Sequence, residues 1–393
     1  MRTIAAAALA ALLAAPAPAR AEESAPAAPP SGREAARAGH ERGLAFLRSK
    51  AVEGKWGVGG RPEPGITALV VTAFLESPGG VPGKDRALVD GAVAWLASLQ
   101  KEDGGIYEQG NANYTTSLAV QALSLHGEER HAAAIGKAVG FLRRMQFCEE
   151  GGADRVVERR DLRYGGMGYG SDPTQPDLSN TQFALESLRA AGVPESDPAF
   201  QRALTYLQRT QNRKENETEG EPTSKPEKDG KVLVRASDGG ATYRPFDSKA
   251  GNFERPDGKL EARSYGSMTY ALLKCYVYAG LGPDDPRVKD AVKWIRANYS
   301  WERNPGFPDA AGAQQGLYYY FATAARALSL LGDGAAGAGA DGKARDWRAD
   351  LGARLLALQK PDGSFENPND RWMEGLPEVA TAFALKALAA AAE

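Results

Sequence analysis

The chain has 393 residues, which is enough for one large domain or two small ones. Its formal net charge of −2 argues against a nucleic acid or an anionic membrane surface as a partner. Its two cysteines are too few for a disulfide framework of the kind that holds small exported domains together.

The N-terminus has the pattern of a secretory signal peptide. Arg2 supplies a positive charge, residues 4–13 form an apolar run, and Ala-Arg-Ala at 19–21 places small residues at both positions of a cleavage site. We therefore expect residues 1–21 to be removed after Ala21, giving a secreted or periplasmic protein. The apolar run is too short to span a bilayer and no second candidate follows, so no transmembrane helix is expected.

Residues 22–38 are rich in Pro and Ala and are typical of a linker, and residues 39–393 form the predicted folded domain. Within that domain one helical signature recurs six times, with an apolar pair followed four residues later by Gln. The first copy lacks the Gln and the fifth has Tyr299 in its place. Each copy has the apolar spacing of an amphipathic helix. The copies are GLAFLRSK (43–50), GAVAWLASLQ (91–100), AVGFLRRMQ (138–146), RALTYLQRTQ (202–211), AVKWIRANY (291–299) and GARLLALQ (352–359).

A second helix, apolar on nearly all its faces, follows each amphipathic one. In three copies a Gly that can cap the helix C-terminus stands eleven residues after a Thr. Because a helix that is apolar on most faces is buried, we expect the second helices inside and the amphipathic helices outside. The recurring position holds Thr67, Thr116, Thr181, Thr269, Phe321 and Thr381.

A Gly-rich turn separates the two helices of each pair, as in QKEDGGIY (100–107) and QKPDGSF (359–365). Asp103 and Asp362 can bond the nearby backbone, and the Gly that follows tolerates a positive φ. We expect Gln100 and Gln359 to bridge to the same turns.

Six helix pairs match the arithmetic of a helical-repeat protein. An open solenoid would need polar capping repeats at both ends, but the last helix, 378–392, is as apolar as the middle ones. The sequence therefore predicts an all-α fold, an (α/α)6 toroid that closes on itself, with the open solenoid as the alternative.

Residues 212–262 form an insertion within the fourth pair. Its first half is charged and nearly free of apolar residues, which predicts a surface loop. Its second half contains Tyr243, Phe246 and Phe253 among turn residues. That half either folds over one mouth of the toroid or forms an inert ordered loop.

The copies WLASLQKEDGGIY and LLALQKPDGSF resemble the QW repeats of squalene and oxidosqualene cyclases. The β subunits of protein prenyltransferases share the same helical toroid. The resemblance covers roughly residues 40–392. It implies that any chemistry lies at the N-termini of the inner helices, where free N–H groups and the helix dipole face a central cavity.

The segment that matches the D-x-D-D-T motif of the cyclases is Asp177-Leu178-Ser179-Asn180-Thr181. Ser179 stands where the proton donor belongs and Asn180 where its carboxylate neighbour belongs, and neither side chain can protonate an alkene. We expect Asp177 to be a helix N-cap. Its hydrogen bonds to backbone N–H groups and the helix dipole are expected to lower its pKa and to make it unsuitable as a donor.

The prenyltransferases bind zinc through an Asp and a Cys two residues apart and a distant His. Here Cys275 follows Leu273 instead of an Asp, and Cys148 also lacks an Asp two residues before it. His126 and His131 lie near the end of an inner helix, not at its start. We therefore expect no metal and no cofactor, and Cys275 to be a buried thiol; whether the two cysteines are oxidised is left open.

The starts of the inner helices carry aromatic and polar side chains of the kind that line a ligand pocket. The alternative is that these aromatic side chains fill the centre, because packed interiors leave few voids. The densest aromatic cluster is LYYYF at 317–321. The candidate lining residues are Tyr114, Asp177, Ser179, Asn180, Arg263, Tyr265, Tyr270, Gln315, Tyr318, Tyr319 and Glu378.

Three functions remain open. In the first, the chain binds an isoprenoid or other lipid, a peptide or an envelope protein without catalysing a reaction. In the second, it is a terpene cyclase-like or prenyltransferase-like enzyme with divergent catalytic residues. In the third, it is a scaffold that binds partners through its outer face. Loss of both catalytic motifs favours the first over the second. The outer helices are evenly charged and leave no long apolar stripe uncovered on the outside, which argues against the third. Whether the chain is an enzyme, and its oligomeric state, are left undecided.

Overall fold

The computed structural model describes residues 32–170, 175–216, 227–339 and 342–393. The predicted signal peptide, most of the linker and part of the charged half of the insertion lie outside these residues. Within them, no helix is both long enough and apolar enough to cross a membrane.

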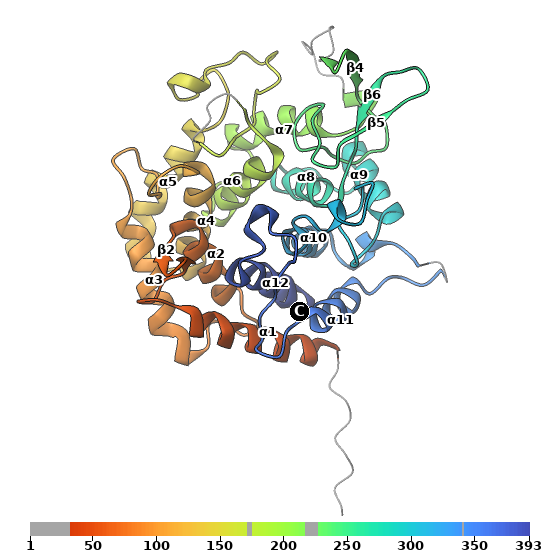
Figure 1. Ribbon diagram of the computed structural model, residues 1–393. Helices are drawn as coiled ribbons and strands as arrows, with labels where there is room; N and C mark the ends of the chain where they lie inside the picture. The colour runs from red at the N-terminus through yellow and green to blue at the C-terminus, as the bar shows by residue number, and fades with distance from the viewer. Residues whose placement is uncertain (1–31, 171–174, 217–226, 340–341) are drawn as a thin grey trace, which may run out of the picture. The chain divides into compact units, whose positions relative to one another are not determined.

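Twelve α-helices in the described chain form two concentric rings, with the inner helices around the centre of Figure 1 and the outer helices at its rim. The outer ring consists of α1 (Gly32–Lys50), α3 (Arg86–Ser98), α5 (Ala132–Arg144), α7 (Pro198–Thr210), α9 (Pro286–Ala297) and α11 (Trp347–Leu358). The inner ring consists of α2 (Pro64–Leu75), α4 (Ala112–His126), α6 (Leu178–Ala190), α8 (Gly266–Tyr278), α10 (Leu317–Leu331) and α12 (Pro377–Ala391). The inner helices are buried on nearly all faces, as predicted from their composition.

The ring closes between the first and last repeats. Helix α12 packs against α2 and α1 as well as against its sequence neighbours α10 and α11. The Gln359 side chain donates a hydrogen bond of 2.8 Å to the Gly39 carbonyl in α1. The all-α closed toroid is therefore confirmed, and the open solenoid is excluded.

The recurring Gln is a joint between successive repeats. The Gln100 amide donates to the Gly104 carbonyl in its own turn (3.0 Å) and to the Ala134 carbonyl in the next outer helix, α5 (2.8 Å). Only the first of these two contacts was expected from the sequence. In the fifth copy the hydroxyl of Tyr299 donates to Asp350 on α11 over 2.8 Å, which replaces the Gln joint. The same pair of bonds is made by Gln146, Gln211 and Gln359.

The recurring Thr fastens each Gly-rich turn to its inner helix. The hydroxyl of Thr116 accepts a hydrogen bond of 3.0 Å from the backbone N–H of Ile106, a fully buried turn residue. Because a buried N–H without a partner is costly, this contact explains why Thr recurs on an otherwise apolar helix. Equivalent bonds are made by Thr67, Thr181, Thr269 and Thr381.

The insertion between α7 and α8 contains a small sheet at the rim of the toroid, which the sequence analysis did not predict (Figure 1). Its order is β3-β4-β6-β5, with β4 and β6 parallel and the other pairs antiparallel. The strands are β3 (Glu227–Lys228), β4 (Lys231–Val234), β5 (Asn252–Glu254) and β6 (Leu260–Ala262). A hairpin of β1 (Gly57–Val58) and β2 (Arg61–Pro62) occupies the first Gly-rich turn.

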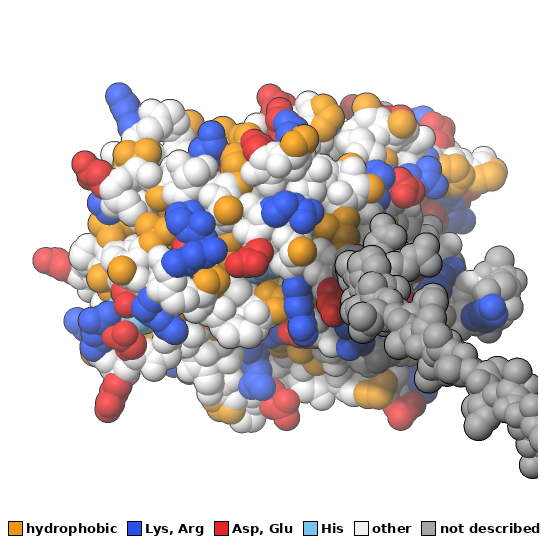
Figure 2. All heavy atoms as spheres, turned by 90° about the horizontal axis from the view of Figure 1, so that it is seen from below, with side chains coloured by type: hydrophobic (Ala, Val, Ile, Leu, Met, Phe, Trp, Pro, Cys, Tyr) orange, Lys and Arg blue, Asp and Glu red, His pale blue; other side chains and the backbone are white. Residues whose placement is uncertain are grey.

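Short 3-10 turns join several of the helices. They are η1 (Gly83–Asp85), η2 (Glu129–His131), η3 (Ala153–Arg155), η4 (Lys214–Asn216), η5 (Gly312–Gln314), η6 (Asp333–Ala336) and η7 (Arg371–Met373). The face of the molecule seen in Figure 2 carries Lys, Arg, Asp and Glu side chains interspersed with small apolar patches. On that face no long apolar stripe is visible, in line with the composition of the outer helices.

Candidate ligand cavity

A cavity of about 250 Å³ lies at the N-terminal ends of the inner helices. Inner helices α4, α6, α8, α10 and α12 contribute to its wall, and loops between the pairs supply the rest. Its lining contains many aromatic side chains, several short polar ones and a single charged group, Lys249. The lining residues are Asn111, Tyr114, Tyr169, Ser179, Phe183, Tyr243, Lys249, Tyr265, Ser267, Met268, Asn304, Phe307, Gln315, Gly316, Tyr319, Trp372, Met373 and Phe383.

The floor of the cavity is a cluster of aromatic rings from four different inner helices. Phe183 packs edge-on against Tyr114 with ring centroids 5.0 Å apart, and against Tyr319 at 5.9 Å. Tyr319 in turn meets Phe383 edge-on at 5.8 Å. Since Phe183, Tyr319 and Phe383 also line the pocket at the opposite mouth of the toroid, they separate the two spaces.

Ser179 occupies the wall above this floor. Its hydroxyl lies 3.1 Å from the hydroxyl of Tyr319, and either can donate. This is the position at which the cyclase motif places its proton donor. A hydroxyl paired with a phenol is far too weak an acid to protonate an alkene.

Asp177 lies one layer behind the wall and caps the start of α6. Its carboxylate accepts hydrogen bonds of 2.8 Å from the backbone N–H and from the side-chain amide of Asn180. The N-cap geometry is as predicted, but the predicted direction of its pKa is wrong. Burial raises the pKa of Asp177 to about 6, because desolvation outweighs the hydrogen bonds from Asn180 and the charge of Arg244.

Glu374 is a second buried carboxyl group near the cavity, and the sequence analysis missed it. It accepts hydrogen bonds from the backbone N–H groups of Tyr318 (3.2 Å) and Tyr319 (2.7 Å) and from the Asn367 side chain (2.8 Å). Burial raises its pKa to about 6, against these hydrogen bonds, which lower it. Glu374 thereby fixes the first turn of α10 from a loop 55 residues further along the chain, which no local pattern reveals.

The mouth of the cavity is covered by a strained turn. Trp372 and Met373 both have φ of 65°, a left-handed conformation that L-residues rarely adopt. Both side chains are nearly half exposed although they are large and apolar. The ammonium group of Lys249 stands 4.4 Å from the ring centroid of Tyr243 and 6.0 Å from that of Trp372, which places the cavity's one charge at this mouth.

The candidate residues from the sequence divide into three groups. Tyr114, Ser179, Tyr265, Gln315 and Tyr319 line the cavity. Asp177 and Asn180 lie behind its wall, as described above. The remaining four, Arg263, Tyr270, Tyr318 and Glu378, are not part of the cavity lining.

Arg263 lies in the insertion with its guanidinium 5.5 Å from the ring of Phe253. Tyr270 is buried against Tyr320, with ring centroids 5.8 Å apart. Tyr318 packs edge-on against Phe365. Glu378 lines a separate groove beside the first Gly-rich turn. The helix starts were assigned correctly, but the direction of each side chain depends on neighbours that lie far away in the sequence.

The opposite mouth of the toroid is polar. There the carboxylate of Glu186 accepts hydrogen bonds from Lys274 (2.8 Å) and from the hydroxyl of Tyr278 (3.1 Å). Although burial opposes ionisation, the charges of Lys274, Lys386 and Arg326 lower the pKa of Glu186 to about 2. The two ends of the central space are therefore chemically distinct.

The two cysteines lie apart from this cavity. Cys148 and Cys275 are both free and buried, in different hydrophobic surroundings, and neither lines the cavity. Burial raises the pKa of both thiols. The Asp–Cys–His arrangement of a prenyltransferase zinc site is not assembled around either cysteine in the described part of the chain.

Residues 62–226 match the sequence model of the squalene-hopene cyclase C-terminal domain. A probable squalene–hopene cyclase of Sinorhizobium fredii is 31% identical over 153 residues, and a squalene–hopene cyclase of Bradyrhizobium diazoefficiens is 32% identical over 156 residues. Those matches cover 38% and 39% of this chain but only 22% of either relative.

The fold has close counterparts among solved structures. The type II terpene cyclase MstE from Scytonema has 15% sequence identity and a TM-score of 0.51, over 92% of this chain and 98% of that one. A variant of the same cyclase, solved in complex with geranylgeranyl dihydroxybenzoate, gives a TM-score of 0.52 at 16% identity, with the same coverage. A protein from Actinoplanes gives a TM-score of 0.50 at 15% identity, over 91% of this chain and all of that one.

Proposed function

The chain belongs to the prenyltransferase/squalene cyclase superfamily, and from that premise we propose that its central cavity binds an apolar ligand of the isoprenoid class without transforming it. One observation carries this proposal. Among the described residues, the cavity is walled by aromatic side chains, and its lining contains no carboxyl group.

The walls suit a chain of apolar or unsaturated carbon atoms. The rings of Phe183, Tyr319 and Phe383 lie at different angles to one another in the cavity floor, and such an aromatic surface favours close packing against methyl groups and double bonds. At the mouth, Lys249 and Gln315 offer donors to a polar end group. A peptide or an envelope protein is the other ligand class that the sequence predicts, and the apolar floor supports it less well.

The size of the cavity limits the ligand. Its volume of about 250 Å³ lies just below the roughly 300–1,000 Å³ that is usual for small-molecule sites. We therefore expect a short isoprenoid, or one end of a longer one, to be held with its apolar terminus on the aromatic floor.

We propose that the ligand is bound and not converted because no acidic side chain of the described residues lines the cavity. Protonation of an alkene requires a donor in contact with the substrate. Ser179 holds the wall position that the cyclase motif gives to that donor, and Asp177 lies behind it with no exposed surface.

The test is equilibrium binding of farnesol and geranylgeraniol to the purified protein, with product analysis by gas chromatography. The variant Ser179→Phe fills the cavity and should lower the affinity at least tenfold. The variant Ser98→Phe adds the same ring to an exposed site on α3 and should leave it unchanged. Equal binding by the wild type and Ser179→Phe, or conversion of either alcohol, would contradict the proposal.

A terpene cyclase-like activity is the second candidate, and the pKa of Asp177 favours it. A carboxyl group with a pKa of about 6 retains its proton in part of the molecules near neutral pH. Tyr169 and Tyr243 line the cavity. Burial raises the pKa of both, and the Asp177 charge adds to this effect, which places both hydroxyl groups close to Asp177. The outcome that would establish this function is a cyclised product from wild type that disappears in Asp177→Asn.

Export is also part of the proposal. It rests on the signal-peptide pattern of residues 1–21 alone. The intact mass of the mature protein tests it, with Glu22 expected as the first residue. Retention of residues 1–21 would contradict it.

A further inference from the structure

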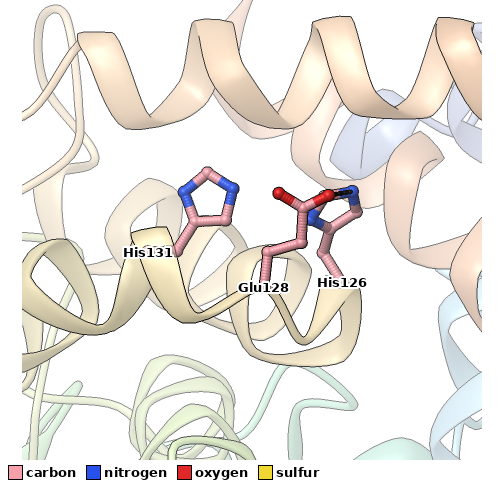
Figure 3. A group of neighbouring side chains, drawn as sticks. All are labelled: His126, Glu128 and His131. Carbon is pink, nitrogen blue, oxygen red and sulfur yellow. Dashed lines mark ion pairs between the residues drawn. The ribbon is translucent and has the colours of Figure 1, made fainter.

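A second cluster of functional side chains lies outside the cavity, in the connection from α4 to α5. Two of the chain's three histidines are found in it. His126 is the last residue of α4, Glu128 follows in the connection, and His131 ends η2 just before α5. Each offers one ligand atom, and these atoms all lie within 4.8 Å of one another. Figure 3 shows the Glu128 carboxylate lying between the two imidazole rings.

The two nitrogens of His126 have different surroundings. Its Nε2 lies 2.9 Å from a carboxylate oxygen of Asp90 on α3 and is engaged in that hydrogen bond. Its Nδ1 is buried and has no hydrogen-bond partner among the described residues. A histidine that donates one ring N–H to a carboxylate and keeps its other nitrogen free has the arrangement of a metal ligand oriented by an acidic neighbour.

His131 stands at the N-cap of α5, a position where some of the other outer helices have a capping Asp, although Asp85 of α3 makes no side-chain cap hydrogen bond. The outer helices α7 and α9 begin with Asp197 and Asp285, whose carboxylates cap the helix by accepting from the backbone N–H two residues later. His131 holds the same N-cap position of α5, and its side chain makes no cap hydrogen bond. It is nevertheless buried, with its ring centroid 5.5 Å from that of His126.

The surroundings favour a cation. His126 stands at the C-terminus of α4, where the helix carries partial negative charge. Glu128 adds a full negative charge, with a carboxylate oxygen 3.8 Å from Nε2 of His126, the nitrogen that also faces Asp90. Arg130 balances that charge through an ion pair of 2.5 Å with Glu128. Because the Arg130 side chain is 58% exposed, it can turn into solvent when a metal ion takes its place.

We propose that His126, Glu128 and His131 bind one divalent transition-metal ion, with zinc as the expected ion, and that Asp90 is a positioning residue for His126. Two imidazoles and a carboxylate form a ligand set that suits zinc and leaves a fourth position open. Ligand atoms around tetrahedral zinc stand roughly 3.4 Å apart, so the three groups, whose ligand atoms lie within 4.8 Å of one another, must close by up to about 1.4 Å. The exposed, flexible Glu128 side chain permits this closure. This departs from the metal-free protein expected from the sequence.

Such an ion would join three helices. Asp90 comes from α3, His126 from the end of α4 and His131 from the start of α5. It would therefore hold the second helix pair to the third on the outside of the ring, independently of any ligand in the central cavity.

The experiment is calorimetric titration of chelator-treated, full-length protein with Zn²⁺. One equivalent should bind. Glu128→Gln and His131→Ala should each lower the affinity at least tenfold, and Glu129→Gln, a change at an exposed neighbour, should not. Arg130→Ala should raise the affinity, because it removes the competing cation. Glu128, Glu129 and Arg130 are all exposed, so these variants test the site even where a change at a buried histidine impairs folding.

Two further readouts distinguish this site from zinc binding at a cysteine or elsewhere on the chain. Co²⁺ bound here should give a visible spectrum without a thiolate charge-transfer band. Asp90→Ala should lower zinc affinity about ten- to hundredfold, and Asp90→Asn, which keeps an oxygen acceptor, should retain most of it. No saturable binding, binding that Glu128→Gln and His131→Ala leave unchanged, or binding lost in Cys148→Ser would overturn the proposal.

Discussion

Replacement of Gln359 by Met tests the closure of the ring through one side chain. Met preserves the length and flexibility of Gln but cannot donate a hydrogen bond. The change removes the bonds that Gln359 donates to the Gly39 carbonyl (2.8 Å) and to the Gly363 carbonyl (3.0 Å). Each such bond contributes about 0.5–1.5 kcal/mol net, so the free energy of unfolding should fall by about 1–3 kcal/mol. The change also removes an exposed bond of 2.6 Å that the Gln359 side-chain oxygen accepts from Arg42.

The matched control is Gln100→Met in the second repeat. Gln100 makes the same two bonds at the same distances, 3.0 Å to Gly104 and 2.8 Å to Ala134, and is half-buried in the same way. The two shared bonds are equivalent, and Gln359 makes the additional exposed bond with Arg42. In a closed ring Gln359→Met should therefore lose at least as much free energy of unfolding as Gln100→Met.

The assay is urea unfolding followed by circular dichroism in the helix band, analysed by linear extrapolation. In an open chain Gln359 would keep only the bond within its own turn, and its replacement would cost about half as much as that of Gln100. A loss for Gln359→Met at or below half the loss for Gln100→Met would refute the closed ring.

In urea unfolding, Thr116→Val should lower the free energy of unfolding by about 1–3 kcal/mol, because it leaves the buried Ile106 N–H unpaired. Thr116→Ser keeps the hydroxyl and should be nearly neutral. Equal losses of stability in the two variants would show that the hydroxyl does not matter. Asp177 binds its proton more tightly in the folded state, since its pKa rises from 3.8 to about 6. The protonated Asp177 side chain therefore makes its full contribution to the free energy of unfolding below pH 4, and this contribution is lost as the pH rises through 6. Relative to Asp177→Asn, the free energy of unfolding of the wild type should fall by about 3 kcal/mol over this pH range. A difference between the two proteins that does not change with pH would contradict the raised pKa. Cys148 and Cys275, both buried thiols of raised pKa, should react with a thiol reagent only after unfolding; rapid labelling of the native protein would contradict their burial.

The fold was largely predictable because its signals are local and repeated. The Gln and Thr positions, the Gly-rich turns and the apolar second helices each recur at a fixed place in the helix pair. The second bond of each Gln was not predictable, because it reaches an outer helix far away in the sequence: for Gln100, Gln146 and Gln211 a helix that begins about 30 residues or more further along, and for Gln359 the first helix of the chain. The strands of the insertion were missed because each is only two to four residues long.

The cavity was only partly predictable. The sequence correctly predicted that the cavity lies at the N-terminal ends of the inner helices, and the predicted residues Tyr319 and Ser179 do line it. Glu374 and Trp372 were missed, since they come from the loop before α12 and nothing in their spacing marks them as neighbours of α10. The pKa of Asp177 was misjudged because its burial, which depends on the whole ring, outweighs the local hydrogen bonds.

The histidine cluster shows a different limit. His126 and His131 were set aside because they stand at the end of an inner helix, where the known zinc site of the fold does not lie. Their relation to Asp90, which comes from another helix 36 residues earlier, became visible only in three dimensions.

Native mass spectrometry after incubation with geranylgeraniol tests the central claim most directly. We expect a complex whose added mass is that of one unchanged ligand, present with wild type and Ser98→Phe and absent with Ser179→Phe. A spectrum without a complex for the wild type, or an extracted ligand that has been cyclised by wild type and not by Asp177→Asn, would contradict it.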